Sequence, residues 1–280
     1  MSFSTELKEE MSKTENLANK EAVKYELVGY LMSSNISENG EKIKFSTENE
    51  YNINRFSRLL SNIGIDDYDI SIQGKVFMIT CPNIKIQTKS LSIDQIKNII
   101  KGAYLGAGSI NNPENTYHLE IGLRKKEYAD LIMNGLKDFN IKCNCLEKNK
   151  EYIIYLKDGE EISKILALFG ANKSVLKYEE IRVQREMNNK INRIVNCETA
   201  NMNKTMNAAI EQIETIRKLK KSGKFEKLDE SLKELAELRL KNPSASLVEL
   251  GKMLKTPIGK SGVNYRLKKI MEIGKTNVKK

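Results

Sequence analysis

The hydrophobic pattern of the chain contains one segment that occurs twice, at residues 27–35 and 100–108. Both copies are largely apolar and place small residues four positions apart. These small residues are Gly29 and Ser33 in the first copy and Gly102 and Gly106 in the second. Because four residues make about one helical turn, each copy predicts a helix with a smooth groove that another backbone can approach closely. We expect the two helices to pack against each other through these residues.

The segments that follow each copy repeat as well. A strand, an amphipathic helix and a two-stranded hairpin are predicted after both. In the first copy they lie at 42–46, 52–63, 68–73 and 75–81, and in the second at 116–122, 125–139, 141–147 and 151–157, with a closing helix at 159–169. The sequence therefore predicts an α+β fold, a pseudo-twofold domain over 21–173 made of two αβαββα repeats, about 21–90 and 94–173. Residues 1–20 are expected to form an amino-terminal arm or helix.

A helical linker is predicted beyond this domain, at 174–222. Residues 175–219 contain few helix breakers and show helical spacing of apolar residues, for example at Met187, Ile191 and Ile194. The asparagine-rich middle of this segment is poor in helix formers, so we expect a break near Cys197 to Asn203. Residues 220–225 indicate a flexible connection.

The last region, 223–280, has the signals of a helix-turn-helix domain. An apolar helical face spans Leu228 to Leu238, and Asn242 with Pro243 ends that helix. Ser246 and Glu249 have capping-box spacing, which predicts a second helix to about Leu254. A turn at 256–259 then leads to a third helix at 260–273, which is expected to bury Val263, Leu267 and Ile270.

The net charge is concentrated in this carboxy-terminal region. The whole chain has 47 Lys and Arg against 37 Asp and Glu, and residues 204–280 hold 19 of these cations against 9 acids, so the remainder is balanced. A basic module beside a neutral one indicates binding to a polyanion through the basic part, although a three-helix bundle with a basic exterior is the alternative.

The third helix carries the candidate DNA contacts. Asn264 could pair with adenine and Lys268 with guanine, and Ser261 and Tyr265 share their exposed face. Phosphate contacts are expected from other cations of this helix. These are Lys260, Arg266 and Lys269.

The repeated helices and strands resemble the LAGLIDADG homing-endonuclease fold, in which two such helices form the central interface below a saddle that binds DNA. In active members an acidic residue near the end of each helix holds a divalent metal. The matching positions here are Ser34 and Ala107, and neither supplies a carboxylate. The resemblance therefore implies a scaffold that kept the fold and lost the nuclease, with no catalytic residue, metal or cofactor.

More specifically, the chain resembles the WhiA family of sporulation-associated DNA-binding regulators over nearly its whole length. The matching stretches are 101–113, 117–121, 185–189, 192–198 and 260–269. The resemblance implies a sequence-specific transcriptional regulator connected with sporulation and with cell division or chromosome segregation. Its expected partners are double-stranded DNA and, through the neutral amino-terminal domain, another regulatory protein or RNA polymerase.

The composition limits the classes of protein to which the chain can belong. No run of about 18 apolar residues exists and the first ten residues alternate charge, so we expect a cytoplasmic, nucleoid-associated protein with no membrane segment. His118 is the only histidine, which excludes a two-histidine metal site, and the cysteines at 81, 143, 145 and 197 are expected to be reduced. An RNA-binding or splicing-assisting protein and a divergent homing endonuclease remain as alternatives.

Overall fold

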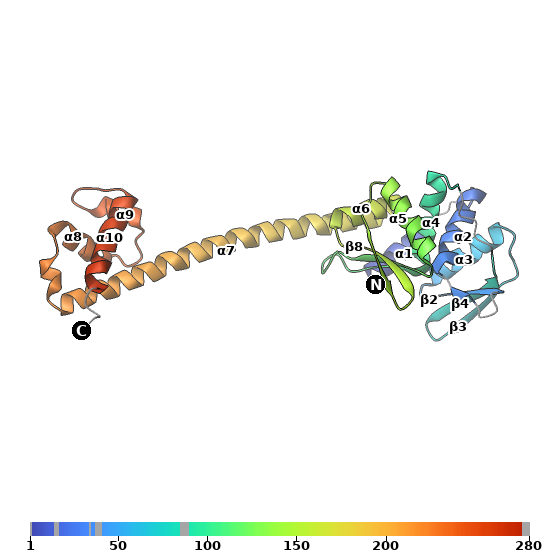
Figure 1. Ribbon diagram of the computed structural model, residues 1–280, viewed down its shortest axis with the longest axis horizontal. Coiled ribbons are helices and arrows are strands. Elements are labelled where there is room, and N and C mark those ends of the chain that lie inside the picture. Colours follow the sequence, from blue (N-terminus) through green and yellow to red (C-terminus); the bar gives the residue numbers. More distant parts are fainter. Residues whose placement is uncertain (1, 14–16, 34, 37–40, 85–89, 276–280) are drawn as a thin grey trace. The chain divides into compact units, whose positions relative to one another are not determined.

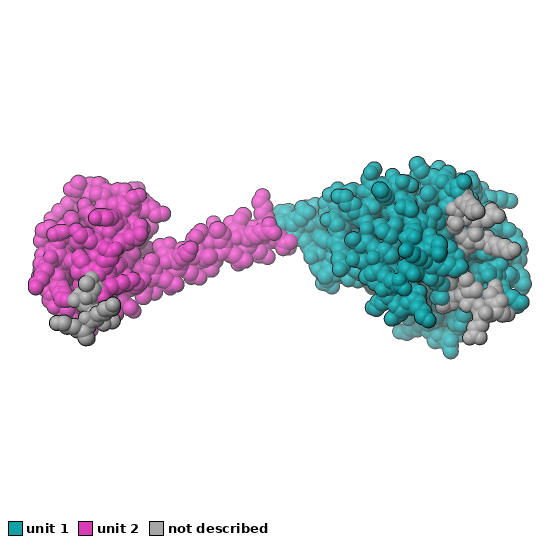
Figure 2. All heavy atoms as spheres, in the orientation of Figure 1, with its two compact units in different colours: residues 1–187 teal, residues 188–280 magenta. Residues whose placement is uncertain are grey.

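The computed structural model describes residues 2–13, 17–33, 35–36, 41–84 and 90–275 (Figure 1). The chain forms two compact units, residues 1–187 and 188–280 (Figure 2). The division between them falls inside helix α7 (Asn172–Lys221), within the segment for which the sequence predicts a linker. Each unit is described by itself below.

The first unit contains two repeats with the same order of elements, which confirms the predicted pseudo-twofold α+β fold. The first repeat consists of α2 (Lys20–Ser33), β1 (Asn35–Ile36), β2 (Lys42–Thr47), α3 (Glu50–Asn62), β3 (Asp69–Gln73) and β4 (Val76–Pro82). The second consists of α4 (Ile93–Ala107), β5 (Gly108–Ile110), β6 (Leu119–Leu123), α5 (Lys126–Asp138), β7 (Asn144–Lys148), β8 (Glu151–Leu156) and α6 (Gly159–Leu168). Each repeat forms a four-stranded antiparallel sheet, in the orders β1-β2-β4-β3 and β5-β6-β8-β7.

The strands β1 and β5 are additions to the predicted repeat. They are two and three residues long, too short to show the alternation by which a strand is recognised in a sequence. Each follows the central helix of its repeat directly and pairs with the next strand. A closing helix is present as α6 in the second repeat, whereas residues 83–84 and 90–92 of the first repeat, the described part of the corresponding segment, are not helical.

Helices α2 and α4 lie side by side at the centre of the unit (Figure 1). A methyl group at Gly29 would collide with the backbone of α4, at the carbonyl oxygen of Ile99 and the amide nitrogen of Ala103. On the other helix, a methyl group at Gly102 would collide with the backbone carbonyl of Glu26. The glycines therefore allow the two backbones to touch without intervening side chains.

The same seam continues toward the carboxyl ends of the two helices. Gly106 lies against Ser33, whose hydroxyl would meet any side chain placed at Gly106. The Ser33 hydroxyl instead donates a hydrogen bond to the carbonyl of Tyr30, 2.9 Å away within its own helix. The structure thus brings together all four small residues that the repeat singles out.

A buried ion pair fixes α3 against this seam. The guanidinium of Arg55 makes two hydrogen bonds to the carboxylate of Glu26, at 2.5 and 2.8 Å, and both side chains are 4% exposed. The ammonium of Lys101 lies 3.4 Å from the same carboxylate. Burial lowers the pKa of Lys101, and the carboxylate of Glu26 opposes that shift. Breaking such a pair would leave an uncompensated buried charge, so the three residues constrain α2, α3 and α4 together.

A second buried contact joins the same three helices. The side chain of Asn52, on α3, is fully buried and donates from its amide nitrogen to the carbonyl of Leu105 on α4 at 2.8 Å. Its amide oxygen accepts a hydrogen bond from the hydroxyl of Tyr30 on α2. Both polar ends of Asn52 are therefore satisfied across two helix interfaces, as a buried amide requires.

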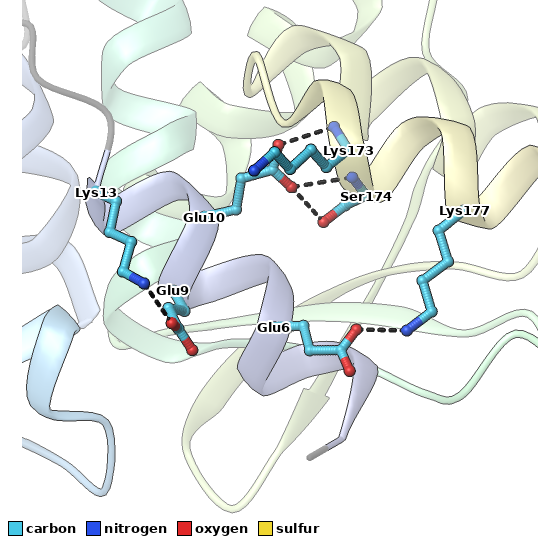
Figure 3. Close-up of a pocket in the computed structure, with 7 residues that line it drawn as sticks. All are labelled: Glu6, Glu9, Glu10, Lys13, Lys173, Ser174 and Lys177. Atoms are coloured by element: carbon cyan, nitrogen blue, oxygen red, sulfur yellow. Dashed lines mark hydrogen bonds and ion pairs between the residues drawn. The ribbon is translucent and has the colours of Figure 1, made fainter.

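The amino-terminal segment is part of the first unit's core. Helix α1 (Phe3–Lys13) buries Phe3, Leu7 and Met11. The carboxylate of Glu10 accepts hydrogen bonds from the backbone amides of Lys173 and Ser174 at 2.8 and 2.9 Å (Figure 3). These amides lie in the first turn of α7, where an acidic group offsets unpaired donors. Figure 3 shows a pocket lined by charged side chains of α1 and α7. The contact of Glu10 with the two amides in this pocket is a helix cap.

The second unit contains the end of α7, a short 3-10 helix at Lys224–Lys227, and the helices α8 (Glu230–Lys241), α9 (Leu247–Met253) and α10 (Lys260–Lys275). Its core consists of apolar side chains from these helices together with Leu228 and Leu254, which follow the 3-10 helix and α9. The helical members include Ile216, Leu219, Phe225, Leu232, Leu235, Leu250, Val263, Leu267 and Ile270. Among the described residues of the chain, no helix is long and apolar enough to cross a membrane.

Two predictions for the region between the domains are wrong. Helix α7 runs without a break through residues 197–203, because asparagine lowers helix propensity but keeps its backbone amide, and the segment holds no glycine or proline. Residues 220–225 are the end of α7, a turn at 222–223 and the start of the 3-10 helix, rather than a flexible connection. Gly223 adopts a φ of 71° there, which glycine tolerates, and Phe225 is buried immediately after it.

The close seam leads to a prediction for the first unit. The substitution Gly102→Ala should lower the free energy of unfolding by about 2 kcal/mol, because the added methyl meets backbone that cannot rotate away. Chemical denaturation of the full chain, monitored by a spectroscopic signal that reports unfolding of the first unit, would measure this loss. Gly122→Ala is the control, since its nearest neighbours would lie at an ordinary 3.8 Å. Equal stability of Gly102→Ala and the wild type would contradict the seam.

Candidate nucleic-acid interface

Helix α9 begins with the capping box that the sequence predicts. The hydroxyl of Ser246 accepts from the amide of Glu249 at 3.3 Å, and the carboxylate of Glu249 accepts from the amide of Ser246 at 2.7 Å. The hydrogen bond from the Ser246 backbone lowers the pKa of Glu249. This cap fixes where α9 starts after the loop that follows α8.

The turn between α9 and α10 depends on a glycine. The amide of Ile258 donates to the carbonyl of Gly251 at 3.1 Å, and a methyl group at Gly251 would collide with the carbonyl oxygen of Ile258. Gly251 is buried within α9, where glycine costs about 1 kcal/mol relative to alanine. The close approach explains the residue, because it lets the chain fold back tightly and sets the direction of α10.

A buried arginine holds the other connection of the motif, between α8 and α9. The guanidinium of Arg239, 2% exposed as a residue, donates to the carbonyl of Ala245 at 2.7 Å. Burial lowers the pKa of Arg239. Sequence analysis missed this residue, since an arginine beside Leu238 has the pattern of a solvated helix position. Its acceptors lie in a loop whose path the sequence does not specify.

Helix α10 separates a buried face from an exposed one. Val263, Leu267 and Ile270 pack into the core of the second unit. Six of the seven predicted DNA contacts are exposed, and Arg266 is partly buried. The exposed six are Lys260, Ser261, Asn264, Tyr265, Lys268 and Lys269.

The exposed residues of α10 occupy different parts of its surface. The spacing of Ser261, Tyr265 and Lys268 places them in one row opposite the buried face, and Tyr265 is 69% exposed. Asn264 borders this row on one side. On the other side lies Lys269, whose ammonium is 3.6 Å from a carboxylate oxygen of Asp229 before α8. The helix therefore presents a polar row with cations at its edges.

The structure describes one of the two candidate metal positions of the first unit. Ala107 is exposed at the end of α4, and Ser34 lies outside the described residues. In the described part of the chain, no group of three or more His, Cys, Asp or Glu side chains could hold a metal ion. The imidazole of His118 lies 3.3 Å from the carboxylate of Glu120 and stacks on Tyr155. His118 is therefore a structural residue on the surface of the sheet that contains β6 and β8.

The four cysteines are free thiols. Burial raises the pKa of Cys81 to about 11, and it has the same effect on Cys143. Thiols with raised pKa values are poor nucleophiles and poor metal ligands at neutral pH.

Two family models match the chain. Residues 96–188 match the WhiA LAGLIDADG-like domain, and residues 191–274 match the WhiA C-terminal HTH domain. The second match includes all of α8, α9 and most of α10, whereas the first covers the second repeat of the amino-terminal unit and the start of α7.

Individual relatives agree with these models. The probable cell division protein WhiA of Clostridium botulinum is 48% identical over 174 residues, which are 62% of this chain and 55% of that protein. Its counterpart in Clostridium perfringens is 47% identical over 177 residues, 63% of this chain and 56% of that protein. The matched part of the chain thus spans a little over half the length of these relatives.

Solved structures extend the likeness to the full chain. Full-length WhiA from Thermatoga maritima is 28% identical, with a TM-score of 0.63, over 99% of both chains. The isolated N-terminal LAGLIDADG domain of WhiA is 24% identical, with a TM-score of 0.54, over 60% of this chain and 90% of that one. The latter likeness shows the fold of the first unit.

The tight turn leads to a prediction for the second unit. Gly251→Ala should destabilise this unit by about 2 kcal/mol, because its methyl would collide with the Ile258 carbonyl and force α10 away from α9. Thermal unfolding followed by circular dichroism would measure the loss. Gly259→Ala is the control, since no atom lies within 4 Å of its added methyl, and only the small cost of changing a helix cap is expected there. Equal effects of the two substitutions would argue against the close approach.

Proposed function

The chain belongs to the WhiA family, and on that premise we propose that it is a sequence-specific DNA-binding regulator that contacts duplex DNA through α10. The observation that carries the proposal is the exposed face of α10, a row of hydrogen-bonding side chains bordered by cations. A helix of this kind fits the major groove, where it reads base edges while flanking residues meet phosphates. The relatives are named probable cell division proteins, and we propose a role in cell division for this chain as well.

The position of each side chain suggests its role. Asn264 and Lys268 extend from the exposed face and have the donors and acceptors that pair with adenine and guanine, and Ser261 lies two turns before Lys268. Lys260 and Lys269 lie at the margins of the helix and suit phosphate contacts. Arg266 is partly buried near the core side, so we assign it to a phosphate at the edge of the interface. Tyr265 contributes an exposed hydroxyl between these groups.

We also propose that the first unit is not a nuclease. Hard divalent cations need oxygen ligands, usually including carboxylates, and the methyl group of Ala107 offers none. The charge balance of residues 1–203 also differs from the basic surface expected of a protein that grips DNA through a saddle. A charge-balanced unit of this kind suits a protein partner, such as another regulator or RNA polymerase.

Alanine substitutions should separate two kinds of contact. Asn264→Ala and Lys268→Ala should cost about 1 to 3 kcal/mol on a duplex selected by the full chain and leave binding to random duplex nearly unchanged. Lys260→Ala and Lys269→Ala should weaken binding to every duplex, and each should reduce the slope of log affinity against log salt by about 0.9. Fluorescence anisotropy at several salt concentrations measures both quantities.

Lys218→Ala is the matched control for this series, since Lys218 is exposed on α7 in the same unit and lies outside the face of α10. Equal losses on selected and random duplexes for all four variants would contradict base reading by α10. Tighter binding of a single-stranded RNA than of any duplex would favour the RNA-binding alternative.

The absence of nuclease activity is a separate prediction. Pure protein incubated with supercoiled plasmid and with the selected duplex should leave both intact in magnesium or manganese, because Ala107 cannot ligate a cation. Gel electrophoresis detects nicking and cutting, and a reaction with a chelator is the control. Metal-dependent cleavage that copurifies with the protein would overturn this part of the proposal.

A further inference from the structure

Helix α7 carries a row of exposed apolar side chains in its part that belongs to the second unit. All have about half or more of their surface in contact with solvent, up to 63% for Met202. They are Ile191, Ile194, Val195, Met202 and Met206. A row of large exposed apolar side chains along one helix face is typical of an interaction site. We call this row the α7 stripe.

The stripe continues a face that is already buried. Further along the same helix Ala209 is buried, and Ile216 and Leu219 pack into the core of the second unit. Spacings of eleven residues link the two parts, from Ile191 to Met202 and on to Ile213. An eleven-residue period corresponds to about 3.67 residues per turn, so the stripe runs nearly straight along a regular helix. One continuous face thus changes from covered to exposed.

The sequence around the stripe does not stabilise a lone helix. Residues 188–207 include seven asparagines, each less favourable than alanine by about 0.6 kcal/mol, which amounts to roughly 4 kcal/mol. Such a segment gains most of its helical stability from packing of its apolar face. We therefore expect another surface to cover the stripe, because packing of the stripe would supply the stability that keeps this segment helical.

We propose that the stripe is covered by the same stripe of a second copy of this chain, in an antiparallel pair of α7 helices. One charged residue, Glu198, lies on the same face between Val195 and Met202, while Arg193 and Lys204 lie on the opposite side of the helix by their spacing. Two copies can therefore approach without repulsion between cations. The contact would be isologous, with the same surface used by both copies, as in most homodimers.

The position of Glu198 selects the antiparallel arrangement. A parallel pair in register would face the two Glu198 carboxylates across the interface. An antiparallel pair centred between Val195 and Glu198 faces each Glu198 with Val195 of the other copy and brings it toward Lys190 of that copy. The same pairing brings Ile191 opposite Met202, which are both large and apolar.

The size of the stripe is sufficient for a moderately stable pair. In this pairing residues 187–206 of the two helices lie side by side, over about 30 Å at 1.5 Å per residue. Two helices in contact over that length bury on the order of 1,000 Å² in total, which is near the lower limit for a specific interface. We expect association at micromolar concentrations. This inference does not rest on the proposed DNA binding.

Sedimentation equilibrium of the full chain without DNA tests the proposal. The wild type should show a concentration-dependent mass that rises from 31.9 kDa toward twice that value. Met202→Glu should weaken the pair on the order of 100-fold, since each dimer would bury two unpaired charges. Ala200→Glu is the matched control, because Ala200 is exposed on the opposite side of the same helix, and it should associate like the wild type.

A third variant tests the centre of the interface. Glu198→Leu should tighten association by removing the one charge from the stripe. A wild type that stays monomeric at high concentration overturns the proposal, and so does equal weakening by Met202→Glu and Ala200→Glu. Circular dichroism of each variant establishes that the helix remains folded, so loss of association is not loss of structure.

Discussion

The contact between the backbones of α2 and α4 is the constraint on which the first unit depends. Gly29 and Gly102 leave no room for a side chain, so the two helices have one distance and one crossing at which they fit. Around this seam, buried polar side chains pair with one another across the helices. Asn52 bonds to both helices, and the Arg55 guanidinium pairs with Glu26. Because each sheet is anchored to its own central helix, the seam also sets the relation of the two sheets.

The second unit also depends on a close approach of two backbone segments, which one glycine allows. Gly251 lets the backbone at Ile258 approach α9, and this approach directs α10 so that one face is buried and the other is free. The capping box at Ser246 and the buried Arg239 hold the loop between α8 and α9 in place. The exposed row on α10 is therefore held by rigid neighbours. In the first unit the comparable end of α4 presents Ala107, whose methyl group offers no ligand to a cation.

Much of this architecture could be predicted from periodicity and small-residue spacing. The repeated helices, the main strands, the capping box and the three carboxy-terminal helices each depend on local signals, and the structure contains them. Two kinds of feature could not be predicted from the sequence. Strands β1 and β5 are too short to alternate, and their pairing depends on the helix that precedes them. The burial of Arg55 and Arg239 depends on partners distant in sequence or on loop paths, so each has the local pattern of a surface residue. The predicted break in α7 failed because weak helix formers do not remove backbone hydrogen bonds.

The stripe on α7 and the exposed face of α10 belong to the same compact unit, which connects association with DNA recognition. A twofold axis through a pair of α7 helices would relate the two α10 helices by the same axis. Duplex DNA has local twofold axes of its own, so a symmetric pair fits two half-sites of opposite orientation better than one site alone. Each copy would then bind its half-site at a higher effective concentration than a free monomer experiences. Modest base contacts by a short helix such as α10 could in this way yield a selective complex.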